Sequence, residues 1–403
     1  MPWNEVKPLN ERTRFIADYL NHYFSITELC HRYNISRTTG YKWIERFQKD
    51  GPAALCDRSR RPHCSPYRTP DHVVKELLVL RSKHPNWGPK KLLWRIKKDH
   101  PDWTLPATST TSLILKKNGC IKKRRRSMKR YHPGRPMSPI TAPNDTWTTD
   151  FKGHFKTKDG IYCYPLTIAD GFSRYIFACE GMLHPKHEHV KPVFQRLFET
   201  YGLPNRIRSD NGNPFASIAL GRLSRLSVWW IRLGIMPELI ELGHPEQNGI
   251  HERMHRTLKQ ETVLPPARNL NKQQKRFNAF CNEFNNDRPH EGLGMKPPAE
   301  AYKPSQRPMP KKLPQIEYPA HFEVRLVSEN SGIRWKDGHR KGRVSVSHVL
   351  SGEYVGLEEV DNGIWDVYFG PIWLGRLDER IMRIIDKYGN SQREKTKVKH
   401  NKV

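Results

Sequence analysis

Apolar residues recur at helical spacing through the first 50 residues, with polar residues between them. Residues 11–23 predict one helix. Residues 26–50 predict two more, separated by a tight turn at 33–35, with Ser36 placed to cap the second. Two short helices joined by a tight turn form a helix-turn-helix. Its predicted inner face contains Leu29, Ile35, Gly40 and Ile44, and the small Cys30 would allow close helix approach.

The second of these helices carries polar and basic residues on its outer face, close to its N-terminus. Recognition helices read base edges in the major groove from this position. The expected DNA-contacting residues are Arg37, Thr38, Thr39, Tyr41 and Lys42. A helical hairpin without groove contacts is the alternative.

Residues 71–120 contain three further segments of helical periodicity. Gly88-Pro89 is a typical helix start and Gly119 a typical helix stop. The pattern predicts a second helix-turn-helix or a winged helix, although a plain helical bundle fits it too. The side chains expected to face a groove are Thr108, Ser109 and Thr111.

The pattern changes at Asn144, where strand-like segments rich in β-branched and aromatic residues begin. Three such segments, expected to be antiparallel, lie within residues 146–181. Alternating helices and strands follow, up to a helix that opens at Glu246. This order predicts an α+β core of the ribonuclease-H-like type.

After a proline- and lysine-rich linker, short apolar segments alternate with turns between residues 316 and 385. Asp361-Asn362-Gly363 is a hairpin signal. The pattern predicts a small β-barrel, with Arg334, Lys336, Arg340, Lys341 and Arg343 on its loops, where they would contact DNA or a partner subunit.

The chain of 403 residues carries 70 Lys and Arg against 41 Asp and Glu, a net charge of +29. Charge of this sign along the whole chain indicates a polyanionic partner, which composition alone does not resolve into DNA or RNA. The most basic stretch lies between residues 121 and 142, where we expect an extended linker that contacts phosphates. Its expected DNA contacts are Lys122, Lys123, Arg124, Arg125, Arg126 and, in a narrow minor groove, Arg135.

The seven cysteines are scattered, with no pair two residues apart, so no disulfide framework or zinc site is predicted. No apolar run approaches the length of a membrane span, and the N-terminus has no hydrophobic signal region. We expect a cytoplasmic, nucleoid-associated protein with no membrane partner.

Three acids occupy positions from which carboxylates can converge. Asp150 lies in the first predicted strand, Asp210 follows a later strand, and Glu252 lies on the late helix. Carboxylates on neighbouring strand ends and a facing helix can hold hard divalent ions, which activate water or a 3′-hydroxyl in phosphoryl transfer. A lone Asp before Gly is usually a turn residue, but three acids in this order favour a metal site.

At these residues the chain resembles the insertion-sequence DDE transposases with a retroviral-integrase-like catalytic core. The matching segments are TWTTDFKG around Asp150, RSDNGNPF around Asp210, HPEQNGIHERMHRTLK around Glu252, and FNNDRPHEGLGMKPPAEAY from Phe284 to Tyr302. The resemblance implies that two Mg²⁺ ions, replaceable by Mn²⁺, are bound by Asp150, Asp210 and Glu252. It also implies cleavage at the ends of a mobile element and transfer of the 3′-hydroxyls into target DNA.

The identity of the third acid depends on the alignment. The number of residues between Asp210 and Glu246 equals the spacing for which many of these enzymes are named. The local pattern favours Glu252, because Pro245 to Gly249 match the loop before the acid in this family. We therefore predict Glu252, with extra residues accommodated between 218 and 234.

Basic residues around Glu252 are expected to contact DNA near the site. The resemblance implies this for Arg256 and Lys259, and helical phase adds Arg253 and His255 as candidate phosphate contacts. His251 is interpreted as a surface residue, with a proton shuttle as the alternative.

The combined prediction is a multidomain DNA transposase. The predicted parts are a helix-turn-helix domain at 1–55, a basic linker at 56–70, a second helix-turn-helix or winged-helix domain at 71–120, a basic linker at 121–142, the ribonuclease-H-like core at 143–302, a linker at 303–315, the barrel at 316–386 and a basic tail at 387–403. Its partners would be double-stranded element ends and target DNA, and joining two ends implies a homodimer or higher oligomer. The alternatives are a transposase-derived regulator without catalysis and a ribonuclease-H-type nuclease.

Overall fold

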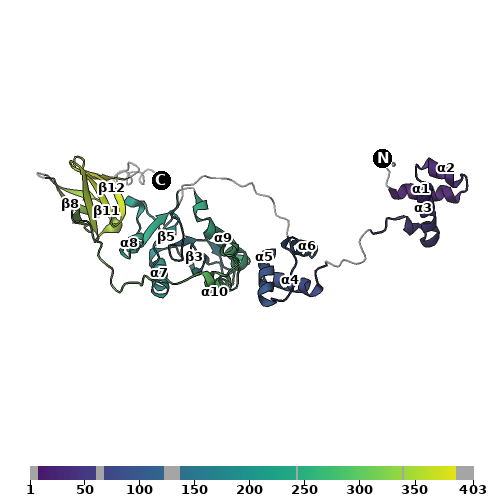
Figure 1. Cartoon of the computed structure of the whole chain (residues 1–403). Helices are drawn as coiled ribbons and strands as arrows, with labels where there is room; N and C mark the ends of the chain where they lie inside the picture. Colours follow the sequence, from purple (N-terminus) through teal and green to yellow (C-terminus); the bar gives the residue numbers. More distant parts are fainter. Residues whose placement is uncertain (1–7, 60–67, 122–136, 242–243, 338–339, 387–403) are drawn as a thin grey trace. The chain divides into compact units, whose positions relative to one another are not determined.

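The computed structural model describes residues 8–59, 68–121, 137–241, 244–337 and 340–386 (Figure 1). The described part divides into two compact units, one up to Pro70 and one from Asp71 onward, and each is considered separately. None of the described helices is long and apolar enough to span a membrane.

The first unit consists of α1 (Pro8–Leu20), α2 (Ile26–Arg32), α3 (Arg37–Asp50) and a short 3₁₀ helix, η1 (Pro52–Leu55). Ser36 caps α3 as predicted, because its hydroxyl accepts a hydrogen bond from the Thr39 amide at 3.2 Å. Leu29, Gly40 and Ile44 are buried, also as predicted. A Cβ on Gly40 would lie 2.5 Å from Cys30 Sγ, so α2 and α3 approach as closely as the helix-turn-helix pattern indicated.

The second unit begins with three helices, α4 (Asp71–Lys83), α5 (Pro89–Asp99) and α6 (Thr108–Lys117). Their shared core contains Leu77, Trp87 and Leu92. The expectation that Thr111 faces a groove is wrong. Its side chain is fully buried and its hydroxyl donates to the Ala107 carbonyl oxygen at 3.1 Å, because it shares the inner face of α6 with Leu115.

A six-stranded mixed sheet forms the centre of this unit, in the order β2-β3-β1-β5-β6 with β4 paired to β3. The strand bounds are β1 Thr146–Phe151, β2 Phe155–Lys156, β3 Tyr162–Asp170, β4 Ile176–Met182, β5 Arg206–Ser209 and β6 Met236–Leu239. The first strands pair antiparallel as predicted, whereas β5 and β6 add in parallel. This is the predicted ribonuclease-H-like arrangement.

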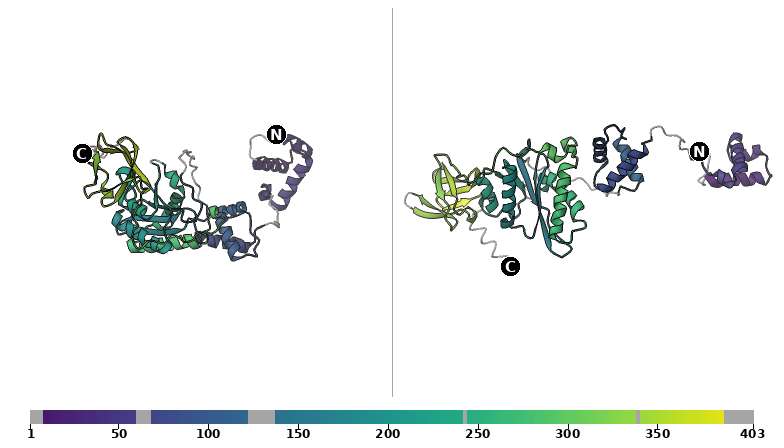
Figure 2. Two further views of the ribbon diagram at one scale, coloured as in Figure 1. Left: turned by 60° about the vertical axis from the view of Figure 1, so that its left-hand side comes forward. Right: turned by 90° about the horizontal axis from the view of Figure 1, so that it is seen from below.

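Helices cover both faces of the sheet. Trp147 and Ile168 face α7 (His187–Tyr201) and α8 (Arg225–Arg232), in a cluster that includes Phe194 and Trp230. The opposite face carries α9 (Gly249–Leu258) and α10 (Leu270–Asn286). Figure 2 shows the teal helices on one side of the sheet and the green helices on the other. The remaining short helices here are η2 (Leu220–Arg222), η3 (Pro245–Asn248), the π-helix η4 (Lys259–Val263), η5 (Glu291–Leu293) and α11 (Pro298–Ala301).

The C-terminal region forms a five-stranded antiparallel sheet, β13-β12-β11-β10-β7, and a separate β8-β9 hairpin. The bounds are β7 Glu323–Leu326, β8 Gly332–Asp337, β9 Arg340–Ser345, η6 His348–Leu350, β10 Tyr354–Asp361, β11 Ile364–Phe369, β12 Ile372–Asp378 and β13 Arg383–Ile385. The hairpin predicted at 361–363 joins β10 to β11. The predicted barrel is not confirmed, because strand pairing among the described residues closes no barrel. The basic residues expected on its loops, Arg334 and Arg343 among them, belong to β8 and β9.

Candidate active site

Asp150 and Asp210 lie on adjacent parallel strands. Thr149 of β1 pairs with Ser209 of β5, so each acid is one residue beyond the same register pair. Adjacent strands lie about 4.8 Å apart, and this register therefore brings both acids to the same edge of the sheet. The Asp210 carboxylate accepts a hydrogen bond from the Gly212 amide at 3.2 Å, which holds it in the turn after β5.

Glu252 is exposed on α9, the helix that crosses the same face of the sheet as Asp150. Met254 and Leu258 anchor α9, since both are buried in the cluster beneath it. Ile250 lies four residues before Met254 but is 43% exposed, so the buried face of α9 does not extend to it. The predicted start at Glu246 is a 3₁₀ turn, η3, and the α-helix itself begins at Gly249.

The negative charges of the other two predicted acids act on Asp150. Burial raises the pKa of Asp150 to about 7, and the negative charges of Asp210 and Glu252 also raise it. Burial raises the pKa of Asp210 as well. Glu246 instead lies 2.7 Å from His244, Oε1 to Nδ1. A carboxylate whose ionisation is disfavoured by burial and by neighbouring negative charge is one that a bound cation would stabilise.

The three carboxylates do not form a ready-made coordination shell. Within the described ranges, no group of three His, Cys, Asp or Glu side chains is arranged closely enough to hold a metal ion. The donor set nevertheless consists of carboxylate oxygens alone, which suits a hard divalent cation. The charges of Asp210 and Glu252 therefore act on Asp150, but within the described residues the three carboxylates are not close enough together to surround one ion.

Two buried histidines connect α9 to the strand that carries Asp150. Thr167, the register partner of Asp150, contacts His251 Nε2 at 2.7 Å and His255 Nε2 at 2.6 Å through its hydroxyl oxygen. His255 Nδ1 lies 3.5 Å from Asp150 Oδ2. Thr148 closes the network with a 2.9 Å contact to His251 Nδ1.

Both threonine hydroxyls of this network also donate to backbone carbonyl oxygens, Thr167 to Asp150 at 3.0 Å and Thr148 to Ala169 at 3.2 Å. Burial lowers the pKa of His251 to about 3, and burial together with the charge of His251 lowers that of His255. Both rings are therefore neutral, and each contacts the strands through hydrogen bonds and not through ion pairs.

This network corrects two expectations. His251 is 1% exposed and His255 is 3% exposed, so neither the surface interpretation of His251 nor a phosphate contact from His255 holds. Their four-residue separation places both on the inner face of α9, the same phase as the sheet contact. Two histidines four residues apart on an amphipathic helix were the available sequence signal.

The other predicted DNA contacts are mostly exposed. Arg253, Arg256 and Lys259 lie at the surface, and Lys259 begins η4. In the first unit, Arg37, Thr38, Tyr41 and Lys42 are exposed, whereas Thr39 is half-buried and hydrogen-bonded to Ser36. Thr108 and Ser109 are exposed on α6. The predicted contacts Lys122, Lys123, Arg124, Arg125, Arg126 and Arg135 lie outside the described residues.

Comparison with protein families identifies the central and N-terminal regions. Residues 140–245 and 233–298 match two models described as integrase core domain. Residues 11–63 match a helix-turn-helix domain, and residues 39–115 match a homeodomain-like domain.

Individual relatives come from insertion elements and retroviruses. An uncharacterized 39.2 kDa protein of insertion element IS476 from Xanthomonas euvesicatoria is 28% identical over 188 residues, which cover 45% of this chain and 50% of that protein. The Gag-Pol polyprotein of Baboon endogenous virus (strain M7) is 33% identical over 118 residues, which cover 29% of this chain and 6% of the polyprotein. The chain thus spans half the length of these relatives or less.

Solved structures show only a distant likeness. The catalytic core domain of HTLV-2 integrase in complex with magnesium aligns with 40% of this chain and 98% of its own, at 17% identity and a TM-score of 0.32. A simian T-cell lymphotropic virus intasome in complex with PP2A regulatory subunit B56 gamma aligns with 74% of this chain and 97% of its own, at 18% identity and 0.36. Scores of this size do not establish a common fold.

The family assignment therefore rests on the sequence matches. The two integrase core models together span the segments around Asp150, Asp210 and Glu252, and the insertion-element protein covers nearly half of the chain. The recognition made from the motifs is confirmed by these matches: residues 140–298 of the chain are similar to integrase core domains, as found in proteins of insertion elements and retroviruses.

Proposed function

We propose that this protein is a DNA transposase that binds the terminal repeats of a mobile element, cleaves at its ends and transfers the 3′-hydroxyls into target DNA. The observation that carries this proposal is the placement of Asp150 and Asp210 at one edge of the sheet, on adjacent strands in register. The negative charges of Asp210 and of Glu252 on α9 both raise the pKa of Asp150, although these residues come from distant parts of the chain. The similarity of residues 140–298 to integrase core domains supports a role in phosphoryl transfer for this group.

Asp150, Asp210 and Glu252 are the residues that would hold two Mg²⁺ ions, or Mn²⁺ in their place. When bound, these ions would supply Lewis-acid activation of the attacking oxygen and stabilise charge on the transferring phosphate. The protein's own contribution is positional. The β1–β5 register sets the spacing of the two aspartates, and the Thr167–histidine network fixes α9 against the strand of Asp150.

The helical modules are proposed to bind the element ends as double-stranded DNA, through α3 and the exposed start of α6. Arg253, Arg256 and Lys259 would contact DNA beside the carboxylates. Because two ends must be joined, the active complex contains at least two copies of the chain. The proposal includes the domain boundaries expected from the sequence. It also includes the cytoplasm as the place where the protein acts on DNA.

The first experiment is joining of a labelled duplex, carrying the host element's own end, into plasmid DNA with Mg²⁺, Mn²⁺ or a chelator. Wild type is compared with Glu252→Gln and with Glu246→Gln, the matched control. We expect metal-dependent joining that Glu252→Gln abolishes and Glu246→Gln retains.

The other results separate the alternatives. Loss in Glu246→Gln alone would shift the third acid to η3 and leave the function unchanged. Specific end binding without cutting under any metal would favour a regulator. Cutting without joining, and without preference for the element end, would favour a nuclease of the ribonuclease-H type.

A further inference from the structure

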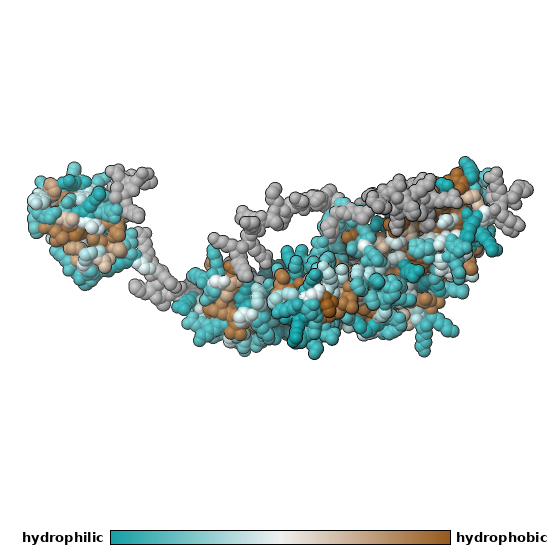
Figure 3. Space-filling view, turned by 180° about the vertical axis from the view of Figure 1, so that it is seen from behind, coloured by the Kyte–Doolittle hydropathy of each residue, from teal (hydrophilic) through white to brown (hydrophobic). Residues whose placement is uncertain are grey.

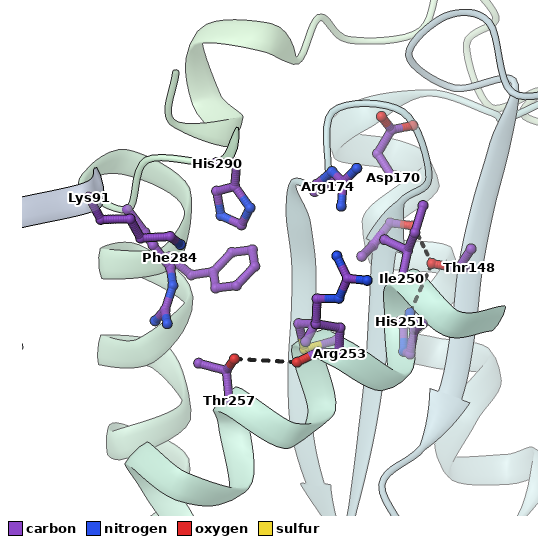
Figure 4. Close-up of a pocket in the computed structure, with 13 residues that line it drawn as sticks. Lys91, Thr148, Asp170, Arg174, Ile250, His251, Arg253, Thr257, Phe284 and His290 are labelled. Atoms are coloured by element: carbon purple, nitrogen blue, oxygen red, sulfur yellow. Dashed lines mark hydrogen bonds between the residues drawn. The ribbon is translucent and has the colours of Figure 1, made fainter. Parts of the chain in front are cut away.

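A pocket that is not lined by Asp150, Asp210 or Glu252 lies beside α9 (Figure 4). Its walls come from β1, from the end of β3 and the turn that follows it, and from α9. The end of α10, the segment after α10, and α5 complete the lining. Ile250, Met254 and Phe284 give it an apolar wall. The cationic residues that line it are Lys91, Arg174, Arg253 and Arg288. His290 also lines it and is neutral, because burial lowers its pKa to about 3.

Positive charge in this pocket is only partly neutralised. Arg288 pairs with Glu261 at 3.0 Å. Asp170 also lines the pocket, but its carboxylate accepts hydrogen bonds from Ser173 and from the Asn144 amide. Across the residues that the structure describes, neither Arg253 nor Lys91 forms an ion pair. A surplus of cationic side chains therefore faces a shared cavity.

The cations also act on one another. Burial lowers the pKa of Arg174, and the nearby charge of Arg253 lowers it further. Burial lowers the pKa of Lys91 to about 8, with a contribution from Arg288 that the charges of Glu261 and Glu291 oppose. Groups held together in this way are stabilised when an anion binds between them.

Arg174 Nε and His290 Nε2, two buried nitrogen atoms at the pocket, have no hydrogen-bond partner among the residues that the structure describes. A buried polar atom left unsatisfied keeps an uncompensated desolvation penalty, so such atoms usually have a partner in the functional state. An oxyanion is the ligand that satisfies an N–H donor and compensates positive charge together.

We propose that this pocket binds a phosphodiester group of a DNA strand that runs along α9. The inference rests on the proposed function for the identity of the polyanion. A phosphate oxygen would lie between Arg174 and Arg253, and the apolar wall of Ile250 and Met254 would accept the sugar. Arg253 directly follows Glu252 in α9, so a strand anchored here passes the carboxylates.

The test uses equilibrium binding of the full-length protein to a fluorescent 40-base-pair duplex of random sequence, in chelator, over a series of KCl concentrations. Ile250→Trp fills the pocket without changing charge, and Ile250 is exposed enough to tolerate a larger side chain. Arg253→Gln removes one cation from the pocket. Lys275→Gln removes one cation from the exposed face of α10 and is the matched control.

Loss of one phosphate contact lowers the slope of log affinity against log salt by about 0.9. We expect this loss in both Ile250→Trp and Arg253→Gln, and a wild-type slope in Lys275→Gln. A wild-type slope in Ile250→Trp, with equally small decreases of the slope in Arg253→Gln and Lys275→Gln, would overturn the proposal that the pocket binds phosphate. Arg253 would then act only as a surface charge.

A second measurement addresses phosphate itself. At constant ionic strength, replacing chloride by inorganic phosphate should raise the melting temperature of wild type and Lys275→Gln, but not that of Ile250→Trp. Stabilisation by phosphate without any change of the DNA slope would assign the pocket to a free phosphate and overturn the DNA proposal. Since the chelator prevents catalysis, failure here is distinct from failure of the joining assay.

Discussion

The strand-borne acids and the helix-borne acid of the candidate site are held by different forces. Asp150 and Asp210 take their spacing from the β1–β5 hydrogen-bond register, and Asp210 accepts a further bond from the Gly212 amide. Glu252 is exposed and, within the described part of the chain, makes no hydrogen bond or ion pair of its own. Its position depends on how α9 packs on the sheet. Two of the acids are thus positioned by backbone pairing and the third by side-chain packing.

This difference gives the site one rigid half and one adjustable half. A backbone register cannot shift by less than a whole residue, whereas a helix on a sheet can move by fractions of an ångström.

The largest expected effect comes from the rigid half. Asp150→Asn and Asp210→Asn should each reduce joining by at least about 10³-fold, because a lost ligand cannot be replaced from a fixed register. Glu252→Asp, which keeps the charge on a shorter side chain, should lose only about 10–100-fold, because α9 can partly compensate. Single-turnover joining rates test this, and equal inactivity of Glu252→Asp and Asp210→Asn would remove the distinction.

The next largest effect is expected at Thr167, whose hydroxyl connects α9 to the strand of Asp150. Thr167→Val removes the hydroxyl that joins His251, His255 and the Asp150 carbonyl oxygen. Joining should fall about 10–100-fold, and unfolding should become easier by about 1–3 kcal/mol because buried nitrogens lose their partner.

A matched control separates stability from positioning. Thr157 is also buried, and its hydroxyl donates to Asp159 and to the Ile161 carbonyl oxygen. None of these groups belongs to Asp150, Asp210 or Glu252. Thr157→Val should lower the melting temperature with little change in the joining rate of the folded protein. If both variants lost activity in proportion to stability, the network would have no positioning role.

The sequence predicted the rigid half better than the adjustable half. Strand existence and the antiparallel pairing of β1, β3 and β4 follow from alternation and turn residues, which are local properties. The register that aligns Asp150 with Asp210 is non-local, because these strands are joined by a long connection. The order of the acids along the predicted elements and the family resemblance indicated their convergence, but neither gave the register.

Burial of polar residues was the least predictable feature. Thr111 and His251 look like surface residues by type, and their burial depends on which helix face meets a neighbour. The buried pair of Arg208 and Glu238, at 2.7 Å, likewise forms across β5 and β6 and has no local signal. Composition identifies such residues as polar, whereas only the tertiary contacts supply their partners.

A smaller effect is expected from crowding the Asp210 carboxylate. A Cβ at Gly212 would lie 3.0 Å from Asp210 Oδ2, tighter than most packed contacts. Gly212→Ala should therefore displace this carboxylate and reduce joining by about tenfold, with a nearly unchanged melting temperature. Wild-type joining in this variant would show that the strand-borne half is less rigid than its register suggests.

The smallest effect tests the entry to α9. Gly249 has helical dihedral angles, φ −60° and ψ −23°, and a Cβ there would meet no atom within 4 Å. Gly249→Ala should therefore stabilise the fold by about 0.5–1 kcal/mol, because alanine loses less backbone entropy on folding. Melting temperature and joining rate distinguish two roles for this glycine. A higher melting temperature with unchanged joining means that α9 works in its present conformation. A higher melting temperature with slower joining means that the helix must rearrange at Gly249 before Glu252 reaches the cation, and packing alone would then not position the third acid.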